Sequence, residues 1–501
     1  MTTTLASDRS TAAPDPYDGF DSLYVGGAWR PGGTGRTAED LDPWSGQSVA
    51  SIALASLADV TEALDSAAVA QRDWAAASPG ERARVMRAAA AIVEARKDEI
   101  IGWLVREVGS TVGKAAGEWE TTRGGLYAAA SLAYRVAGQL LPSDVPGKEN
   151  RVYRTPVGVV AVISPWNFPL YLSNRSVAPA LALGNAVVLK PSEDSPVTGG
   201  LLLAKIFEEA GLPAGVLQVI THSREDAALI GDAITTSPVP RFISFTGSTK
   251  VGQAITAKAG IKRLGLELGG NAPVVVLGDA DLAQAVEGAV ISAFAHQGQV
   301  CMSGNRLIVE TPVYDEFVAR FTETVRHLPA GDPANAGTFI GPLINRRQLD
   351  GVLDKLDRAR RSGAKQVLGG EPGGPSGLLL PPHIILGDSG TPTAREEVFG
   401  PVITILRAED EDDALRLAND TEYGLTAAVF TTDLDRGARF AQRVEAGMTH
   451  VNDSTMQGEE HTPFGGEKNS GIGRFGGEWI VEELTTVHWV SIQRTPRRYL
   501  G

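Results

Sequence analysis

The sequence has almost no cysteine: Cys301 is the only one in 501 residues. A chain with a single thiol cannot be a disulfide scaffold or a cysteine-rich metal protein. Cys301 is therefore either a small buried hydrophobic residue or a nucleophile. The surrounding segment, 294–306, is rich in Gly, Gln, Ser and Asn, which suits a backbone that approaches a ligand better than it suits a core. Both interpretations stay open at this point.

The chain also lacks a surplus of positive charge and long apolar runs. It carries 46 Lys and Arg against 60 Asp and Glu, a net charge of −14, so no nucleic-acid or anionic-membrane surface is expected. No run reaches the roughly 18 apolar residues of a membrane span. Neither H-E-x-x-H nor Walker A occurs, and no metal site is predicted. We expect a cytoplasmic protein in which residues 1–21 form a flexible leader without a signal-peptide core.

Glycine and short apolar runs, by contrast, are abundant. The 57 glycines are dispersed among apolar runs in a chain that is 43% hydrophobic, which is typical of an α/β protein. At this length we expect two or three domains. Buried strands alternating with helical segments predict a parallel, doubly wound sheet. The predicted helices are 56–77, one capped by Ser78-Pro-Gly-Glu81, 97–108 and 113–137, and the predicted strands are 157–163, 186–189, 216–220, 242–245 and 274–277.

A second α/β unit is predicted after residue 280. The final segment, 485–492, alternates polar and apolar residues like a strand but has no neighbouring partner in the sequence. Such an edge invites pairing with another chain, so we expect a homodimer or homotetramer. The unit's predicted helices are 281–298, 313–327 and 345–361, and its predicted strands are 306–309, 402–406 and 427–430.

Two glycine-rich segments are candidates for phosphate binding. Gly471-Ile-Gly-Arg-Phe-Gly476 matches G-x-G-x-x-G, but no strand precedes it, so we reject it. Phe245-Thr-Gly-Ser-Thr-Lys-Val-Gly252 leaves a predicted buried strand and opens a helix, where free N–H groups favour an anion. A plain strand–helix turn is the alternative for this second segment.

Further polar residues follow the predicted strands or precede one. Ser164-Pro-Trp-Asn-Phe-Pro169 and Lys190-Pro-Ser-Glu193 stand at the carboxyl ends of two strands, where open α/β sheets bind ligands. Glu267, between apolar residues and glycines, is a candidate for burial and a raised pKa, as a general base requires, although a salt-bridged glutamate is possible. His296 is a poor partner for Cys301, because five residues on one helix place them about 140° apart.

Together these stretches resemble the aldehyde dehydrogenase superfamily, from about Tyr24 to the C-terminus. The resemblance implies an α/β fold with a Rossmann-type cofactor domain (22–137 and 151–266), a catalytic domain (267–480) and a small β oligomerisation element (138–150 and 481–501). The matching motifs are Pro-Trp-Asn-Phe-Pro (165–169), Lys-Pro-Ser-Glu (190–193), Phe-Thr-Gly-Ser-Thr (245–249), Glu-Leu-Gly-Gly (267–270), Gly-Gln-Val-Cys (298–301), Glu-Glu-Val-Phe-Gly-Pro (396–401) and Pro-Phe-Gly-Gly (463–466).

The resemblance also implies roles for individual residues. Cys301 would be the nucleophile, Glu267 the base that activates water, and the Asn167 amide with the Cys301 N–H the oxyanion hole. The cofactor would be NAD, with NADP possible. Its adenosine ribose would lie at Lys190 and Glu193, and its phosphates near Trp166 and Ser248. Its nicotinamide ribose would lie at Glu397, the nicotinamide ring near Phe399 and the carboxamide at Leu268, and the predicted cofactor site is completed by Ile163, Ser192, Gly247 and Gly252.

Segments 170–176, 296–303, 451–454 and 473–477 look most like the aromatic aldehyde dehydrogenases that oxidise benzaldehyde, vanillin or salicylaldehyde. The resemblance implies an apolar substrate pocket and an arginine that meets a ring substituent. The predicted pocket residues are Phe168, Leu172, Arg175, Met456 and Phe464, with Trp119 as a further candidate.

Some features depart from the family pattern or leave alternatives. Thr221–Asp226 replaces a glycine-rich turn, and there Glu193 would repel a 2′-phosphate while Arg224 could attract one. Glu459 and Glu460 have no assigned role. The alternatives to an aromatic aldehyde are a semialdehyde or an aliphatic aldehyde, and the alternatives to hydrolysis are CoA acylation and a catalytically silent relative.

Overall fold

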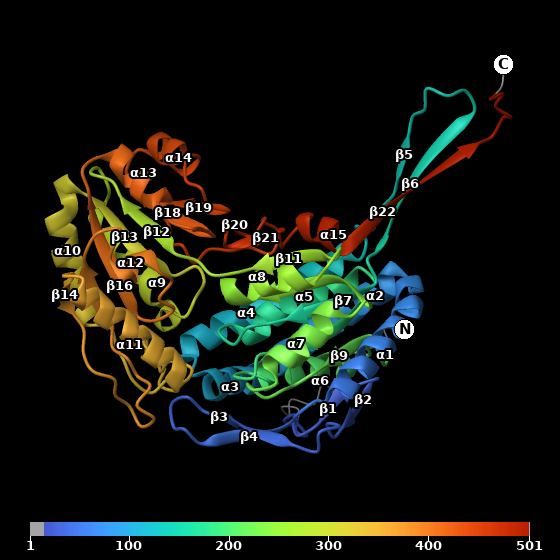
Figure 1. The fold of residues 1–501 in the computed structure, drawn as a ribbon, viewed down its shortest axis with the longest axis horizontal. Helices are drawn as coiled ribbons and strands as arrows, with labels where there is room; N and C mark the ends of the chain where they lie inside the picture. Colours follow the sequence, from blue (N-terminus) through green and yellow to red (C-terminus); the bar gives the residue numbers. More distant parts are fainter. Residues whose placement is uncertain (1–14, 500–501) are drawn as a thin grey trace, which may run out of the picture.

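The computed structural model describes residues 15–499. Two large sheets, each flanked by helices, lie next to each other, and a slender three-stranded arm projects from the body with the C-terminus (Figure 1). This arrangement confirms the predicted fold class. None of the described helices is long and apolar enough to cross a membrane.

The eight-stranded sheet contains the predicted doubly wound core. Five neighbouring strands, β9-β8-β7-β10-β11, run parallel, and β1 and β21 join their two edges antiparallel. In sheet order the strands are β2 (Ala28–Arg30), β1 (Leu23–Val25), β9 (Leu217–Val219), β8 (Ala186–Lys190), β7 (Val159–Ile163), β10 (Pro240–Thr246), β11 (Arg263–Glu267) and β21 (Gly471–Ile472).

One strand of this sheet was missed and one was placed in it wrongly. The segment 274–277, expected as its fifth strand, belongs to β12 (Ala272–Val276) of the other sheet. The place beside β10 is taken by β11, whose sequence Arg-Leu-Gly-Leu-Glu is not a continuous apolar run. Strand β11 ends on Glu267, and the next residues cross to the neighbouring sheet.

The helices around this sheet begin where their caps predict. Ser56 forms a complete capping box with Asp59, whereas Ser78 accepts the Glu81 N–H as the side chain of an N-cap. The helices are α1 (Leu57–Ala76), α2 (Pro79–Ala95), α3 (Lys97–Val108), α4 (Val112–Leu132), α5 (Pro169–Ala182), η1 (Val197–Leu201), α6 (Leu202–Glu209), α7 (Ala227–Thr236) and α8 (Thr249–Lys258).

The seven-stranded sheet is parallel except for its edge strand β14. Its order is β14 (Lys365–Leu368), β15 (His383–Leu386), β16 (Val402–Ala408), β13 (Gly304–Glu310), β12, β18 (Thr426–Phe430) and β19 (Met448–Val451). The helices of this part are α9 (Leu282–Phe294), η2 (Ala295–Gly298), α10 (Thr311–Arg326), α11 (Arg346–Arg361), α12 (Pro392–Arg395), α13 (Glu411–Asn419) and α14 (Leu434–Ala441). The last helix, α15 (Trp479–Leu484), packs instead on α5 beside the eight-stranded sheet.

The C-terminal strand, which has no neighbouring partner in the sequence, pairs with a distant strand of the same chain in the arm. β22 (Thr485–Gln493) pairs antiparallel along all of β6 (Lys148–Pro156), which also pairs with β5 (Gln139–Leu141). β6 runs six residues past the boundary expected at 150. Two further pairs are small: β3 (Thr37–Leu41) with β4 (Ser48–Ala53), and β17 (Tyr423–Gly424) with β20 (Glu467–Lys468).

The predicted leader is anchored in its described part. The Tyr17 N–H donates to Glu99 at 2.7 Å, and the Arg96 guanidinium lies 3.6 Å from the centre of the Tyr17 ring. The prediction of a flexible leader is therefore wrong for residues 15–21, because these contacts fix the chain on α3. Residues 1–14 lie outside the described part of the chain.

Candidate functional site

A cleft of about 720 Å³ opens where β7, β8 and β10 end, at the carboxyl edge of the eight-stranded sheet. Ligands of open α/β sheets bind at this edge. The cleft brings together segments that are far apart in the sequence. Its lining includes these predicted residues: Ile163, Trp166, Asn167, Leu172, Lys190, Ser192, Glu193, Gly247, Ser248, Glu267, Leu268, Cys301, Glu397 and Phe399.

Cys301 follows a strained turn. The helix expected over 281–298 ends at Phe294, and His296 and Gln297 adopt positive φ angles of 49° and 56°, which non-glycine residues rarely do. The carbonyl of Cys301 lies 2.1 Å from where a Cβ on Gly270 would be, so only glycine fits there. Burial, and next the charge of Glu267, raise the pKa of the Cys301 thiol to about 12.

His296 is not a partner for this thiol. It lies beyond the end of α9 rather than on it, and its ring packs edge-on against Phe168, with centroids 5.4 Å apart. Burial lowers the pKa of His296 well below its usual value, so the ring is neutral. The expectation that His296 is no base for Cys301 therefore agrees with the geometry, although the helix used to argue it was wrong.

Glu267 is a buried carboxylate at the end of β11. The side chain is 2% exposed, and neither carboxylate oxygen has a hydrogen-bond partner among the described residues. Burial raises the pKa of Glu267 to about 7, while Arg175 and Arg474 act in the opposite direction. A carboxylate in this state can accept a proton near neutral pH, as a general base must.

Asn167 is held from both sides. Its Nδ2 donates to the Gln299 carbonyl at 2.8 Å, which uses one of its two amide hydrogens. The backbone carbonyl of Asn167 accepts a hydrogen bond of 2.7 Å from Lys114 Nζ. One N–H of the amide thus remains for an oxyanion, in a loop that the surrounding protein fixes.

Lys114 belongs to a buried ion pair that the sequence analysis missed. On α4, Lys114 Nζ pairs with Glu118, whose Oε1 accepts the N–H groups of Leu170 and Tyr171 at 2.9 and 3.2 Å. Glu118 thereby caps α5, the helix that begins directly after the Asn167 loop. In the sequence this is a lysine and a glutamate four residues apart, which ordinarily indicates an exposed pair.

The residues of the cleft fit a dinucleotide. Helix α8 begins in the cleft at Ser248 without a side-chain cap, so its first N–H groups are available to a phosphate. Gly252 has no room for a Cβ, which would meet Leu268 Cδ2 at 2.4 Å, although Gly252 itself is not among the lining residues. The Glu397 carboxylate accepts the Gly270 N–H at 3.0 Å, and Phe399, at a φ of 56°, packs edge-on against Trp166.

At the far end of the cleft, Arg224 is already neutralised. Its guanidinium pairs with Glu193 at 3.2 Å and with Asp194, a residue that the sequence analysis had not singled out. Asp194 also accepts from Asn345 Nδ2 at 3.1 Å. The arginine that could have attracted a 2′-phosphate therefore has two carboxylates of its own.

The predicted substrate residues do not form one wall. Leu172 lines the cleft, whereas Arg175 and Phe464 line a second cavity of about 250 Å³. Met456 and Phe168 line neither of these two cavities. Trp119 is wrong as a pocket residue, because it is buried between helices with its Nε1 bonded to the Val93 carbonyl.

This arrangement can carry out acyl chemistry on a thiol. Addition of the Cys301 thiolate to a carbonyl carbon forms a C–S bond, and the negative oxygen faces the free Asn167 N–H and the Cys301 N–H, each such donor being worth about 3–4 kcal/mol. A nicotinamide cofactor, when bound, supplies the hydride acceptor. Loss of the hydride to that acceptor would leave a thioester on Cys301, and Glu267 would take a proton from the water that attacks this thioester.

Comparisons with known proteins agree with this geometry. The aldehyde dehydrogenase family model matches residues 29–490. A vanillin dehydrogenase of Corynebacterium glutamicum is 48% identical over 96% of this chain and 99% of its own. The structure of an NAD-dependent benzaldehyde dehydrogenase from the same species superposes with a TM-score of 0.88 at 44% identity, covering 97% and 99% of the two chains. A salicylaldehyde dehydrogenase of Pseudomonas putida G7, complexed with salicylaldehyde, gives a TM-score of 0.93 at 37% identity and 95% and 99% coverage.

A doubly wound sheet with a thiol at the mouth of its ligand cleft defines a class of cofactor-dependent enzymes. Within that class, the family match over nearly the whole chain decides the assignment. The chain belongs to the aldehyde dehydrogenase family.

The raised pKa of Glu267 predicts how turnover depends on pH. If the ionised carboxylate is the base, release of the acid should accelerate as the pH rises through about 7. In Glu267→Gln this rise should disappear, and intact-protein mass spectrometry should show an acyl adduct on Cys301. An unchanged pH profile without an adduct would assign the base elsewhere.

The Lys114–Glu118 pair should matter for both stability and activity. Lys114→Met leaves a buried carboxylate and the Asn167 carbonyl without their partner, at a cost of about 3–5 kcal/mol. Thermal melting should detect this loss, and kcat/KM should fall with it. The matched control on the same helix is Arg123→Met, which breaks the exposed Glu120–Arg123 pair and should leave the melting temperature nearly unchanged. Equal losses in both variants would contradict the assignment.

Proposed function

We propose that this protein oxidises an aromatic aldehyde to its carboxylic acid with NAD. The observation that carries the proposal is that the thiol of Cys301, the buried and unpartnered Glu267 carboxylate and the Asn167 amide line one cleft, whose residues fit a dinucleotide. The proposed sequence is thiohemiacetal formation, hydride loss, thioester formation and hydrolysis. A reduced thiol of this kind is consistent with the cytoplasmic location predicted from the sequence.

An aromatic substrate is supported by the walls of the cavities. Phe464 and Phe475 face the second cavity, and Phe168 packs beside the loop of Asn167. Relatives that cover nearly the whole chain carry the names vanillin, benzaldehyde and salicylaldehyde dehydrogenase. Aromatic rings stack favourably on such walls.

NAD is favoured over NADP by the charges at the ribose end. Glu193 faces the cleft with Asp194 beside it, and both carboxylates already hold Arg224. A 2′-phosphate would therefore meet negative charge without a free arginine to offset it. A solved relative is described as NAD-dependent, in agreement with this preference.

Among the alternatives, CoA acylation is disfavoured by Glu267, because a buried carboxylate beside the thiol is suited to activating water. A catalytically silent relative would not need the nucleophile, the base and the amide in one cleft. A semialdehyde substrate is the second candidate, since the unpaired cation of Arg175 near the cavity could attract its carboxylate.

The substrate class can be tested directly. We expect kcat/KM for benzaldehyde to exceed that for short aliphatic aldehydes, with NAD better than NADP, in an assay of absorbance at 340 nm. Cys301→Ala should lower turnover by on the order of 10⁴-fold or more while cofactor binding, measured by calorimetry, persists. A preference for aliphatic aldehydes would refute the aromatic assignment, and substantial activity of Cys301→Ala would refute the mechanism.

We also propose a division of labour between the parts of the chain. The eight-stranded sheet would hold the cofactor, the seven-stranded sheet would present Cys301, and the arm would join subunits into a homodimer or homotetramer. The arm exposes apolar side chains that a monomer would leave in water: Leu140 is 76% exposed, Trp489 62% and Val487 57%.

Charges on the arm should break the assembly. In the double variant Leu140→Asp/Val487→Asp, each aspartate would lose its hydration on subunit contact, so light scattering should report a smaller species than for the unmodified chain. The control is Leu434→Asp on α14, an equally exposed leucine at 67% on the other side of the molecule. A mass unaffected by the double variant would place the interface elsewhere.

A further inference from the structure

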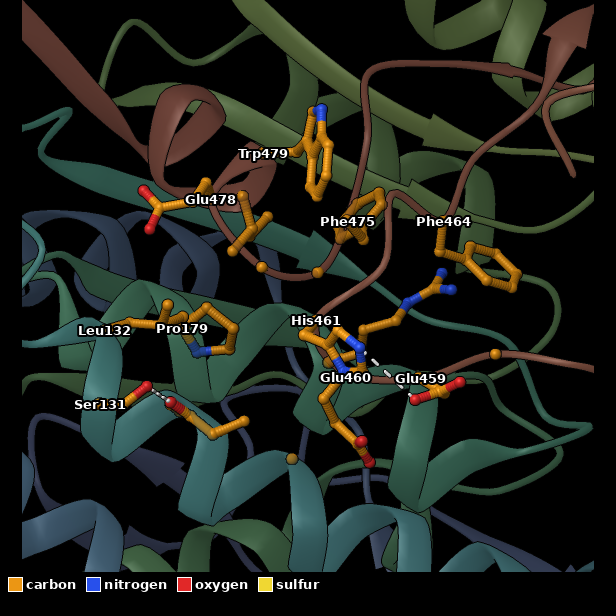
Figure 2. A pocket seen from close by; sticks show the side chains of 18 of the residues that line it. Ser131, Leu132, Pro179, Glu459, Glu460, His461, Phe464, Phe475, Glu478 and Trp479 are labelled. Carbon is orange, nitrogen blue, oxygen red and sulfur yellow. Dashed lines mark hydrogen bonds and ion pairs between the residues drawn. The ribbon is translucent and has the colours of Figure 1, made fainter.

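The second cavity lies beside the first turns of α5, opposite the catalytic cleft. Leu172 on α5 lines the cleft, whereas its neighbours Tyr171 and Asn174 line the cavity, so the two hollows flank the same helix. Much of the cavity wall is apolar, as in Figure 2, where Leu132 and Pro179 lie across from Phe475 and Trp479.

The charged residues around the cavity differ in how they are partnered. Arg135 pairs with Glu478 at 2.7 Å on the exposed rim. Glu459 lies 3.5 Å from the His461 ring, an ion pair only when the histidine is protonated (Figure 2). Arg175 is enclosed differently: the Phe464 and Phe475 rings lie 4.6 and 4.7 Å from its guanidinium carbon.

Glu460 is a carboxylate without any such partner among the described residues. Its carboxylate is half-buried at the cavity and, within residues 15–499, has no hydrogen bond or ion pair. The backbone around it is fixed, because its carbonyl accepts the Gly477 N–H at 2.8 Å. Its Oε1 lies 3.0 Å from where a Cβ on Gly124 of α4 would be, so the side chain rests against a glycine that leaves room for it. In this structure the negative charge therefore lies against α4 at the cavity.

The charge of Glu460 affects the pKa of a residue that lines the cavity. Burial, and in addition the nearby Glu460 carboxylate, raise the pKa of the Tyr171 phenol, against the opposing effect of Arg175. Tyr171 and Arg175 both line the cavity. A negative group brought into the same space would meet the same repulsion, which poorly solvated surroundings screen weakly.

We propose that Glu460 is a specificity-determining residue that excludes aldehydes carrying a second, negatively charged group. The inference rests on the proposed function, because it assumes that the substrate's distal end occupies this cavity. The proposal explains why the cavity need not select semialdehydes although it contains Arg175. Two aromatic rings cover the Arg175 guanidinium, whereas the Glu460 carboxylate has no partner in the described part of the chain.

Substrates of nearly equal shape and different charge test the proposal. The probes are 4-carboxybenzaldehyde, 4-(trimethylammonio)benzaldehyde and neutral 4-methylbenzaldehyde, compared by kcat/KM at low and high salt. In Glu460→Gln, activity on the anionic aldehyde relative to the neutral one should rise by about tenfold or more at low salt, and activity on the cationic one should fall. Salt should reduce both effects.

Glu478→Gln is the matched control, because it removes a carboxylate from the same cavity that is already paired with Arg135. In this variant the ratios of kcat/KM between charged and neutral aldehydes should stay within about twofold of those of the unmodified protein. If Glu460→Gln also leaves the ratios within twofold, the proposal is overturned. It is likewise overturned if the unmodified protein prefers 4-carboxybenzaldehyde and Arg175→Gln abolishes that preference, since Arg175 would then be the selecting charge.

The result can be separated from a failure of the proposed function. If 4-methylbenzaldehyde is not oxidised at all, the aromatic assignment fails, and the charge comparison is repeated with hexanal and its ω-carboxylate analogue. Calorimetric binding of the same aldehydes to Cys301→Ala and to Cys301→Ala/Glu460→Gln gives a readout without turnover. Equal affinities of the anionic aldehyde for these two proteins would overturn the charge filter under either substrate class.

Discussion

The site depends on a carboxylate that, within residues 15–499, is kept out of water without a fixed counter-charge bonded to it, in one cleft with a half-buried thiol. Glu267 is buried with both oxygens unpartnered, and burial raises the pKa values of Glu267 and Cys301 together. Burial of this kind is unfavourable for folding. The rest of the structure must therefore hold the two groups in place by packing and hydrogen bonds made elsewhere. The segment in which the chain crosses from the eight-stranded to the seven-stranded sheet shows how this is done.

That crossing consists of the residues between β11 and β12. Leu268 donates its N–H to the Ser470 carbonyl at 2.8 Å, and the Ser470 hydroxyl donates to the Gly269 carbonyl at 2.7 Å. Gly270 donates to Glu397 and leaves room for the carbonyl of Cys301. The glycines thus bring the base, the nucleophile and Glu397 of the cleft into one place. A Cβ at residue 269 would meet the Glu397 carboxylate at 2.6 Å.

Much of this could be predicted from the sequence, because the short motifs stand at strand ends and strand ends meet at one edge of a parallel sheet. Strand β11 was missed because glycine and arginine interrupt its apolar pattern. The Lys114–Glu118 pair could not be recognised, since i, i+4 spacing is the same for a buried pair as for an exposed one. The ion pairs of Arg224 form because Glu193 and Asp194 lie close to it in space, and the spacing of these residues along the chain does not reveal this.

Arg175 connects the electrostatics of the two hollows. Its charge favours the ionised forms of both Cys301 and Glu267, opposing the effect of burial on each pKa. A direct salt bridge to Glu267 would instead stabilise the carboxylate and weaken it as a base. The rings of Phe464 and Phe475 beside the guanidinium offer it cation–π contacts, and its contact with the Thr246 hydroxyl is a long one of 3.4 Å. The aromatic residues at the cavity thus stabilise the cation without a carboxylate partner, and its field acts on nucleophile and base while leaving Glu267 free to take a proton.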